Sequence, residues 1–247
     1  MTRRPSLAIL IIVSGAFFLL GLYSVFLQGG GSSGKATPTA APSSAGGTAL
    51  PVDSDQTTIL VLGVDSLEAK SPTLRAIWYI TYRLPSKDVF LLGAASDIPV
   101  QGRPGTVMQT AFGWSPENGV SPTFLEDLQR TIPLSFDALV VIDNQGFAAA
   151  VDFLGGVTVN GTSFAGQQVL DILSLTSDDP KGELATQKRV LEALSGKAGD
   201  LGDTPDLTPL VSLVPEHIYL TKPLGQIVAL ISPVLPIHPE TTHIDLY

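Results

Sequence analysis

Four runs of apolar residues predict β-strands. The run at 57–64 (TTILVLGV) is continuous, which is typical of a strand that is covered on both faces. The segments 76–84 and 88–94 are rich in aromatic and branched residues, and residues 85–87 (Pro-Ser-Lys) between them predict a hairpin turn. The segment 136–142 (FDALVVI) predicts a fourth, buried strand.

Apolar residues at helical spacing fill the intervals between and after these strands. Ser121-Pro122 supplies an N-cap and a first-turn proline for a helix that ends at Pro133. Asp143 is expected to cap a second helix, which ends at Gly155-Gly156, where at least one glycine should adopt a positive φ. Further helices are predicted at about 165–175, 183–196 and 222–232. The alternation predicts an α/β fold over residues 56–247, a three-layer α-β-α domain with a mixed central sheet.

The N-terminus carries an apolar segment of a different kind. Leu7–Leu27 contains 21 residues without a charge, and a helix of this length spans a bilayer core of about 30 Å. Arg3 and Arg4 precede it, whereas the next charge is Lys35, so the positive-inside rule places residues 1–6 in the cytoplasm and the rest of the chain outside. A cleaved signal peptide is the alternative. Its apolar region usually has about 7–15 residues, so the length favours an uncleaved, single-pass transmembrane anchor in the cell membrane.

Residues 28–55 form a predicted linker between this anchor and the domain. They are mostly Gly, Ser, Ala, Thr and Pro, a composition with too little apolar bulk to offset the entropy of ordering. From Val52 onward the chain has 11 basic and 23 acidic residues, a charge of −12. Nucleic-acid binding needs clustered cations and is therefore not expected. The absence of cysteine excludes disulfides, thiolate zinc sites and thiol nucleophiles.

Several segments resemble a known family in their order along the chain and in their amino-acid sequences. ILVLGVDS (59–66) is followed by a predicted hairpin that leads to a Ser-Asp pair, and then by FDALVVIDNQGFAAAVDFLGGVTVNG (136–161), whose VDFLGGV portion is the most specific. GQQVLDI (166–172) and QKRVLEAL (187–194) come next. With these motifs, residues 56–235 resemble the LytR-CpsA-Psr family.

The resemblance implies a membrane-anchored, extracytoplasmic enzyme. Members of the family transfer a glycopolymer from a polyprenyl-pyrophosphate carrier to peptidoglycan or a similar wall acceptor, with the help of a divalent cation such as Mg²⁺. In the family, an apolar tunnel between the sheet and the helices holds the polyprenyl tail. The partners implied for this chain are the membrane, through Leu7–Leu27, and a polyprenyl-phosphate lipid carrier or wall glycan.

Most charged positions that the family uses around the pyrophosphate are replaced in this chain. The family's Asp-Thr pair on the second strand is Arg75-Ala76 here, and its Pro-Arg-Asp is Ala95-Ser96-Asp97. Family arginines align with Leu67, Ser174, Thr176, Glu183 and Thr186, whereas a family glutamine survives as Gln187. Arginine forks and a metal ion stabilise the charge on a leaving phosphate, so these replacements predict a degenerate active site.

Five residues are candidates for a remaining site. Asp65 and Asp97 are carboxylates that could hold a metal ion or orient an attacking hydroxyl. Each has a structural alternative, because Asp65 could cap a turn and Asp97 could form an Asx turn. Arg75 and Arg103 could replace the lost arginines, and Gln187 could contact a substrate.

Two functions are compatible with these residues. In the first, the protein is an active phosphotransferase, in which Asp65 and Asp97 organise a metal ion. In the second, it is a non-catalytic protein of the cell envelope that binds a lipid carrier or a glycan, or a scaffold that pairs with an active member of the same family. The lost cations favour the second function.

Overall fold

The computed structural model describes residues 56–159, 161–195, 209, 212–234 and 241–247. The predicted cytoplasmic segment 1–6, the anchor Leu7–Leu27 and the linker 28–55 lie outside the described residues. Within the ranges that are described, none of the helices combines the length and the apolar character that a membrane span requires.

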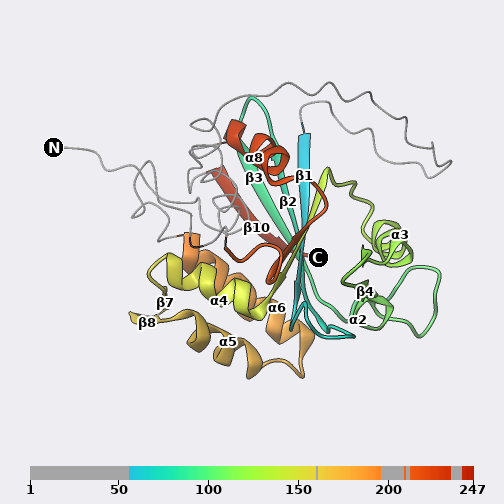
Figure 1. Cartoon of the computed structure of the whole chain (residues 1–247), viewed down its shortest axis with the longest axis horizontal. Helices are drawn as coiled ribbons and strands as arrows, with labels where there is room; N and C mark the ends of the chain where they lie inside the picture. The colour runs from blue at the N-terminus through green and yellow to red at the C-terminus, as the bar shows by residue number, and fades with distance from the viewer. Residues whose placement is uncertain (1–55, 160, 196–208, 210–211, 235–240) are drawn as a thin grey trace.

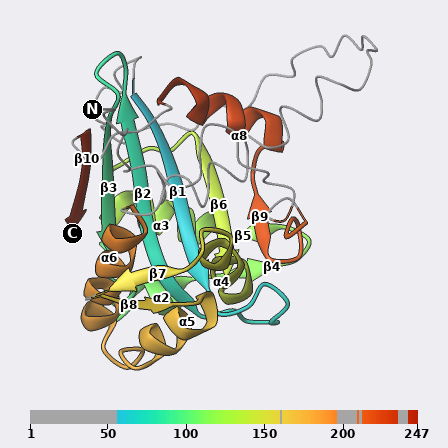
Figure 2. The ribbon, with the colours of Figure 1, turned by 90° about the vertical axis from the view of Figure 1, so that its left-hand side faces the viewer.

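A six-stranded mixed sheet forms the centre of the domain. Its strand order is β10-β3-β2-β1-β6-β9, which Figure 2 shows from left to right. Strand β1 pairs antiparallel with β2 and parallel with β6, which confirms the predicted mixed sheet. The strands are β1 (Gln56–Val64), β2 (Leu74–Arg83), β3 (Asp88–Ala94), β6 (Ala138–Asp143), β9 (Ile218–Leu220) and β10 (Thr242–Leu246).

Helices cover both faces of this sheet, so the predicted three layers are present (Figure 1). One face carries α2 (Met108–Ala111) and α3 (Pro122–Thr131). The other face carries α4 (Asn144–Phe153), α5 (Gly166–Ser174), α6 (Pro180–Ser195) and α8 (Leu224–Ile231). The short elements are β4 (Trp114–Ser115) with β5 (Gly119–Val120), β7 (Val157–Val159) with β8 (Thr162–Phe164), and the 3-10 helix Ser232–Val234.

The side chains of β2 alternate between the two apolar cores. Trp78 and Ile80 pack in the core under α6 and α8, whereas Ile77 and Tyr79 pack in the core under α3. Successive side chains of a strand point to opposite faces, so a strand with both faces covered has a nearly continuous apolar sequence. The three cores of the described residues are built from side chains between Ile59 and Ile244, and we therefore expect residues 48–247 to fold without the N-terminal segment.

Several predicted helix ends are also present. Ser121 occupies the N-cap position of α3, although its side chain makes no capping hydrogen bond. The Gly146 amide donates to Oδ1 of Asp143 at 2.9 Å, so Asp143 caps α4 as predicted. Gly155 and Gly156 after α4 both have positive φ, at 74° and 83°.

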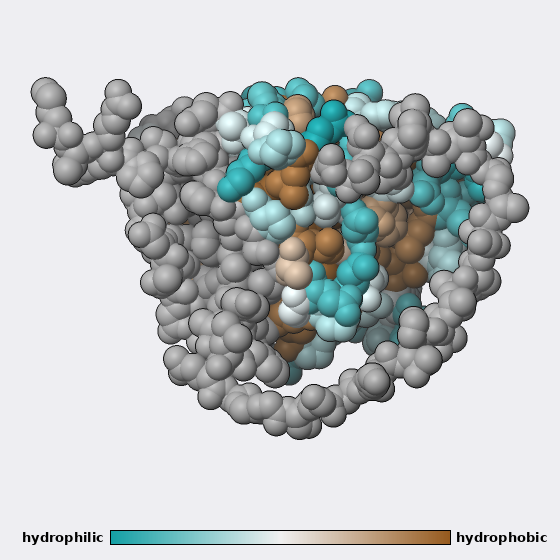
Figure 3. Space-filling view, turned by 90° about the horizontal axis from the view of Figure 1, so that it is seen from above, coloured by the Kyte–Doolittle hydropathy of each residue, from teal (hydrophilic) through white to brown (hydrophobic). Residues whose placement is uncertain are grey.

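Seen from above, the described residues expose hydrophobic groups as patches between hydrophilic ones (Figure 3). This view alone assigns no function to these patches, because apolar atoms contribute much of the surface of any folded protein.

Candidate functional site

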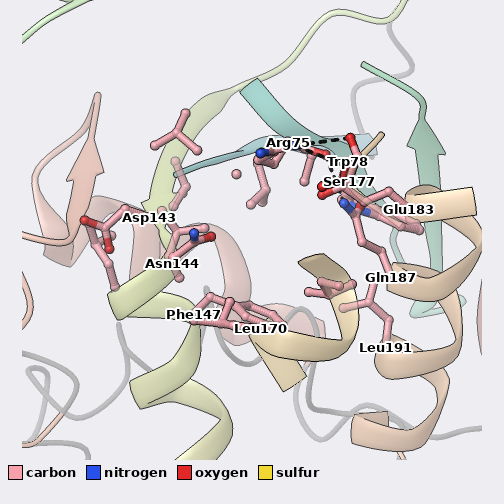
Figure 4. A pocket seen from close by; sticks show the side chains of 18 of the residues that line it. Arg75, Trp78, Asp143, Asn144, Phe147, Leu170, Ser177, Glu183, Gln187 and Leu191 are labelled. Carbon is pink, nitrogen blue, oxygen red and sulfur yellow. Dashed lines mark hydrogen bonds and ion pairs between the residues drawn. The ribbon is translucent and has the colours of Figure 1, made fainter. Parts of the chain in front are cut away.

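A cavity of about 210 Å³ lies between the sheet and helices α4, α5 and α6. Its floor on the sheet and its helical wall are mostly apolar (Figure 4). The apolar lining residues are Val61, Val64, Trp78, Ile80, Val140, Ile142, Phe147, Leu170, Leu173, Leu191 and Ile218.

Two small residues, one at the end of β1 and one near the start of β2, form part of the floor of the cavity. Gly63 and Ala76 are cross-strand partners, and both line the cavity. A Cβ atom at position 63 would lie 2.8 Å from the Ala76 Cβ, so the two strands approach each other too closely for a larger side chain at Gly63. The floor of the cavity therefore depends on glycine and alanine at these two positions.

Arg75, Ser177 and Glu183 form a polar group at one end of the cavity. The Arg75 guanidinium donates to the backbone oxygen of Ser177 at 3.4 Å, and its Nη1 atom lies 3.8 Å from Oε2 of Glu183. The Arg75 side chain is 32% exposed, whereas that of Glu183 is only 7% exposed. Arg75 is thus the more exposed member of the pair, and Figure 4 shows the two side chains on the same side of the cavity.

Burial perturbs the acidity of Glu183. It raises the pKa of the Glu183 carboxyl above its ordinary value of 4.5, and the charge of Arg75 offsets part of this rise. Glu183 also lies in the first turn of α6, where the helix dipole favours a negative charge.

Gln187 is held by both ends of its amide. The indole N–H of Trp78 donates to Oε1 of Gln187 at 3.0 Å, and Nε2 of Gln187 donates to the backbone oxygen of Arg75 at 2.9 Å. The amide therefore joins α6 to β2 and fixes the position of the wall beside Arg75.

A second carboxylate, Asp143, lies on the opposite side of the cavity from Glu183 (Figure 4). Besides capping α4, its Oδ2 atom is 3.3 Å from the Leu67 amide that donates to it and 3.0 Å from Nδ1 of His217. Asp143 is buried, and its oxygens are already used by these groups.

The five sequence-predicted candidates separate into two groups. Arg75 and Gln187 line the cavity, whereas Asp65, Asp97 and Arg103 do not. Asp65 and Asp97 follow the C-terminal ends of β1 and β3. The strand register places these ends beside the start of β2, where Arg75 lies.

The three candidates outside the cavity each have a different local environment. Oδ1 of Asp65 accepts from the amides of Ser66 and Thr73, both at 2.8 Å, so the carboxylate holds the loop between β1 and β2. Oδ1 of Asp97 is buried and has no hydrogen-bond partner among the described residues. Arg103 forms an ion pair with Asp127 of α3, on the opposite face of the sheet.

The cavity does not fit a metal ion with the groups it presents. Mg²⁺ prefers one or two carboxylates together with phosphate oxygens and water. The two carboxylates of the lining, Asp143 and Glu183, already have partners. In the part of the chain that the structure describes, no group of three acidic or histidine side chains could hold a metal ion.

The structure brings together several positions at which the sequence departs from the family. Arg75, Ser174 and Glu183 stand where the resemblance expects Asp, Arg and Arg, and all three line the cavity together with Gln187. At Arg75 and Glu183 the expected charges are exchanged, and the two residues form an ion pair with each other. These three replacements therefore lie at the same cavity.

Two residues contribute to the site in ways that the sequence patterns do not predict. From the sequence alone, Trp78 is explained by core packing. Glu183 is noted there only because it replaces an arginine of the family. No sequence signal identifies Trp78 as a donor, because an aromatic residue on a buried strand needs no further reason. For Glu183, the available signal is an acidic residue at the start of a predicted helix, where the resemblance expects an arginine.

The chain resembles a curated relative at low identity. No protein-family model matches the chain. The polyisoprenyl-teichoic acid–peptidoglycan teichoic acid transferase TagU of Oceanobacillus iheyensis is 19% identical over 202 residues, which cover 73% of this chain and 63% of that protein. The chain thus spans less than two thirds of the length of this relative.

Solved structures share the fold. Bacillus subtilis TagV has a TM-score of 0.59 at 14% identity and covers 79% of this chain and 85% of TagV. A structure described as TagT bound to LI-WTA has a TM-score of 0.58 at 15% identity, with 78% of each chain covered. A LytR-Csp2A-Psr enzyme from Actinomyces oris has a TM-score of 0.57 at 18% identity, covering 76% of this chain and 80% of the enzyme.

Proposed function

We propose that the described residues form a LytR-CpsA-Psr domain, and that the protein serves cell-envelope glycopolymer assembly by binding the lipid part of a lipid-linked glycan, without transferring the glycan. The names of the similar proteins support the ligand class. TagU is named for a polyisoprenyl-linked teichoic acid, and TagT is described as bound to LI-WTA.

One observation carries the non-catalytic part of the proposal. Arg75 is the sole lysine or arginine among the described residues that line the cavity, and Glu183 already lies beside it. Departure of a polyprenyl phosphate develops negative charge, which fixed cations must stabilise, and each lost clamp costs about 3–4 kcal/mol in comparable sites. A cavity with one paired arginine lacks the groups that this step needs.

The apolar lining supports binding of a hydrocarbon chain. Burial of apolar surface contributes about 25 cal/mol per Å² and requires no charged contact. Sites for drug-sized ligands usually enclose about 300–1,000 Å³. At about 210 Å³ the cavity takes a segment of a chain rather than a whole polyprenyl tail.

A transfer assay tests the proposal. Residues 48–247 are incubated with a polyprenyl-pyrophosphate-linked glycan, an acceptor and Mg²⁺, with TagU as the positive control. We expect no release of polyprenyl phosphate above background, and measurable binding of the isoprenoid. Metal-dependent release that is lost in a folded Asp97→Asn variant would contradict the proposal and restore the active phosphotransferase, with Asp65 and Asp97 as its metal ligands.

The place of the domain is a separate proposal. We expect Leu7–Leu27 to anchor the chain with residues 56–247 outside the cell membrane, because the apolar segment is long and preceded by Arg3 and Arg4. Protease added to intact cells should release a fragment that begins within residues 28–55. A free protein whose N-terminus lies beyond residue 27 without added protease would contradict the anchor.

A further inference from the structure

The charged groups of the cavity are unfavourable for a polyanion. Three of the described lining residues carry a charge, namely Arg75, Asp143 and Glu183, so two carboxylates face one guanidinium. Apolar surroundings exclude water, and charges therefore act on a ligand more strongly there than in bulk solvent. The lining therefore presents no excess of positive charge to a ligand with several negative charges.

Arg75 is also occupied by the protein itself. Glu183 lies 3.8 Å away, and the Ser177 backbone oxygen accepts a hydrogen bond from the guanidinium at 3.4 Å. The side chain of Glu183 is only 7% exposed, so it cannot turn into solvent without leaving the wall. A phosphate that approached Arg75 would have to displace this internal anion or share the cation with it.

We propose that the cavity prefers an isoprenoid chain that ends in an uncharged hydroxyl over one that ends in a pyrophosphate, and that Glu183 determines this preference. The inference rests on the proposed lipid binding, and it adds the chemical class of the end group. The role of Glu183 is to neutralise Arg75 and to repel a second anion.

The cavity also offers suitable partners for a hydroxyl. Ser174 and Asn144 are exposed members of the lining, and their side chains can donate or accept a neutral hydrogen bond. A hydroxyl brings no charge into the apolar space, so it avoids the desolvation that a buried phosphate would require.

Binding of two short isoprenoids to residues 48–247 tests the inference. The probes are farnesol and farnesyl pyrophosphate, used below their aggregation concentrations. Trp78 lines the cavity, and the chain contains one other tryptophan, Trp114. Trp114→Phe removes an indole N–H that is buried without a hydrogen-bond partner among the described residues, so this background should fold and leave Trp78 as the sole tryptophan reporter.

We expect farnesol to bind the Trp114→Phe protein at least about tenfold more tightly than farnesyl pyrophosphate. Glu183→Gln should reduce this ratio by about fivefold or more, by strengthening pyrophosphate binding. Glu192→Gln, on the same helix but outside the lining, should leave the ratio within about twofold. Should Glu183→Gln fail to fold, Arg75→Gln gives the converse test, with pyrophosphate binding weakened and farnesol binding retained.

The outcomes separate this inference from the proposed function. Equal binding of both probes, or an unchanged ratio in folded Glu183→Gln, overturns the role of Glu183 while farnesol binding still supports lipid binding. If neither probe binds, the lipid-binding proposal is overturned, and this inference is overturned with it.

Discussion

The indole N–H of Trp78 donates to Oε1 of Gln187 at 3.0 Å, and this bond joins the central strand β2 to helix α6. Both groups are buried, so neither can exchange this partner for water. The same glutamine donates to the backbone oxygen of Arg75. The wall of the cavity is therefore positioned by a polar contact inside an otherwise apolar core.

We expect Gln187→Leu to destabilise the domain by about 1–3 kcal/mol, because it leaves the Trp78 N–H buried without an acceptor. Trp78→Phe removes that donor, so Gln187→Leu should cost less in the Trp78→Phe background than in the wild type. Urea unfolding of the two single variants and the double variant measures this coupling. Strictly additive free energies of unfolding would contradict a functional Trp78–Gln187 bond.

A pH dependence follows from Glu183. Its folded-state pKa is raised by burial above the ordinary 4.5, while the unfolded chain keeps the ordinary value. The stability that this group contributes is therefore fully present below pH 4.5 and is lost as the pH rises through the raised folded value.

Glu183→Gln removes this titration and leaves the other groups in place. We expect the free energy of unfolding of the wild type, minus that of Glu183→Gln, to fall between about pH 4 and pH 7. Urea unfolding of both proteins at both pH values measures this difference. The titration of all other groups affects both proteins alike and cancels. A difference that rises with pH would show that the ion pair with Arg75 outweighs burial.

Asp65 is expected to stabilise a loop. Asp65→Ala leaves the amides of Ser66 and Thr73 without their acceptor, which should cost about 1–2 kcal/mol. Asp65→Asn keeps a carbonyl oxygen and should cost less than half as much. Thermal unfolding of both variants compares them, and equal stability of Asp65→Ala and wild type would contradict this role. Loss of any activity in Asp65→Ala has to be interpreted together with this effect.

The centre of the fold could be predicted from the sequence, whereas its edges could not. Strands β1, β2, β3 and β6 have long apolar runs, since both of their faces are covered. Edge strands β9 and β10 have only three and five residues, and β10 is largely exposed. Such segments contain too few periods for a strand signal and form only because a neighbouring strand is already present.

Prediction of the site was limited by side-chain direction. From the sequence, a residue that follows a strand can be placed near the strand's end, but not on one face of the sheet. The β1–β2 register shifts between Gly63 and Val64, immediately before Asp65, so the alternation of the strand does not extend to Asp65. The Arg75–Glu183 pair joins residues far apart in the sequence, and only the packing of α6 on the sheet brings them together.

The sequence at the start of α6 is compatible with either a turn or the first turn of a helix. Asp178-Asp179-Pro180 is a turn sequence, and the apolar spacing predicts a helix only from residue 183. In the structure, Pro180 is the first residue of α6, because proline fits the first turn, where an amide donor is not needed. This earlier start places Glu183 within the first turn of the helix rather than at its first residue.

The two glycines after α4 should differ in their tolerance of alanine. Both have positive φ, which costs about 1–2 kcal/mol for a residue with a Cβ atom. A Cβ at Gly155 meets no atom within 4 Å, whereas one at Gly156 would lie 2.6 Å from the backbone oxygen of Phe164. We therefore expect Gly155→Ala to lose about 1 kcal/mol and Gly156→Ala to lose clearly more.

Gly225→Ala provides the matched control for this pair. Gly225 lies in α8, its added Cβ meets no atom within 4 Å, and it has no positive φ. Helix propensity then predicts a gain of up to about 1 kcal/mol. Urea unfolding of the three variants gives the comparison. If Gly156→Ala were as stable as Gly225→Ala, the cap at Gly156 and its close approach to β8 would not contribute to the stability of this domain.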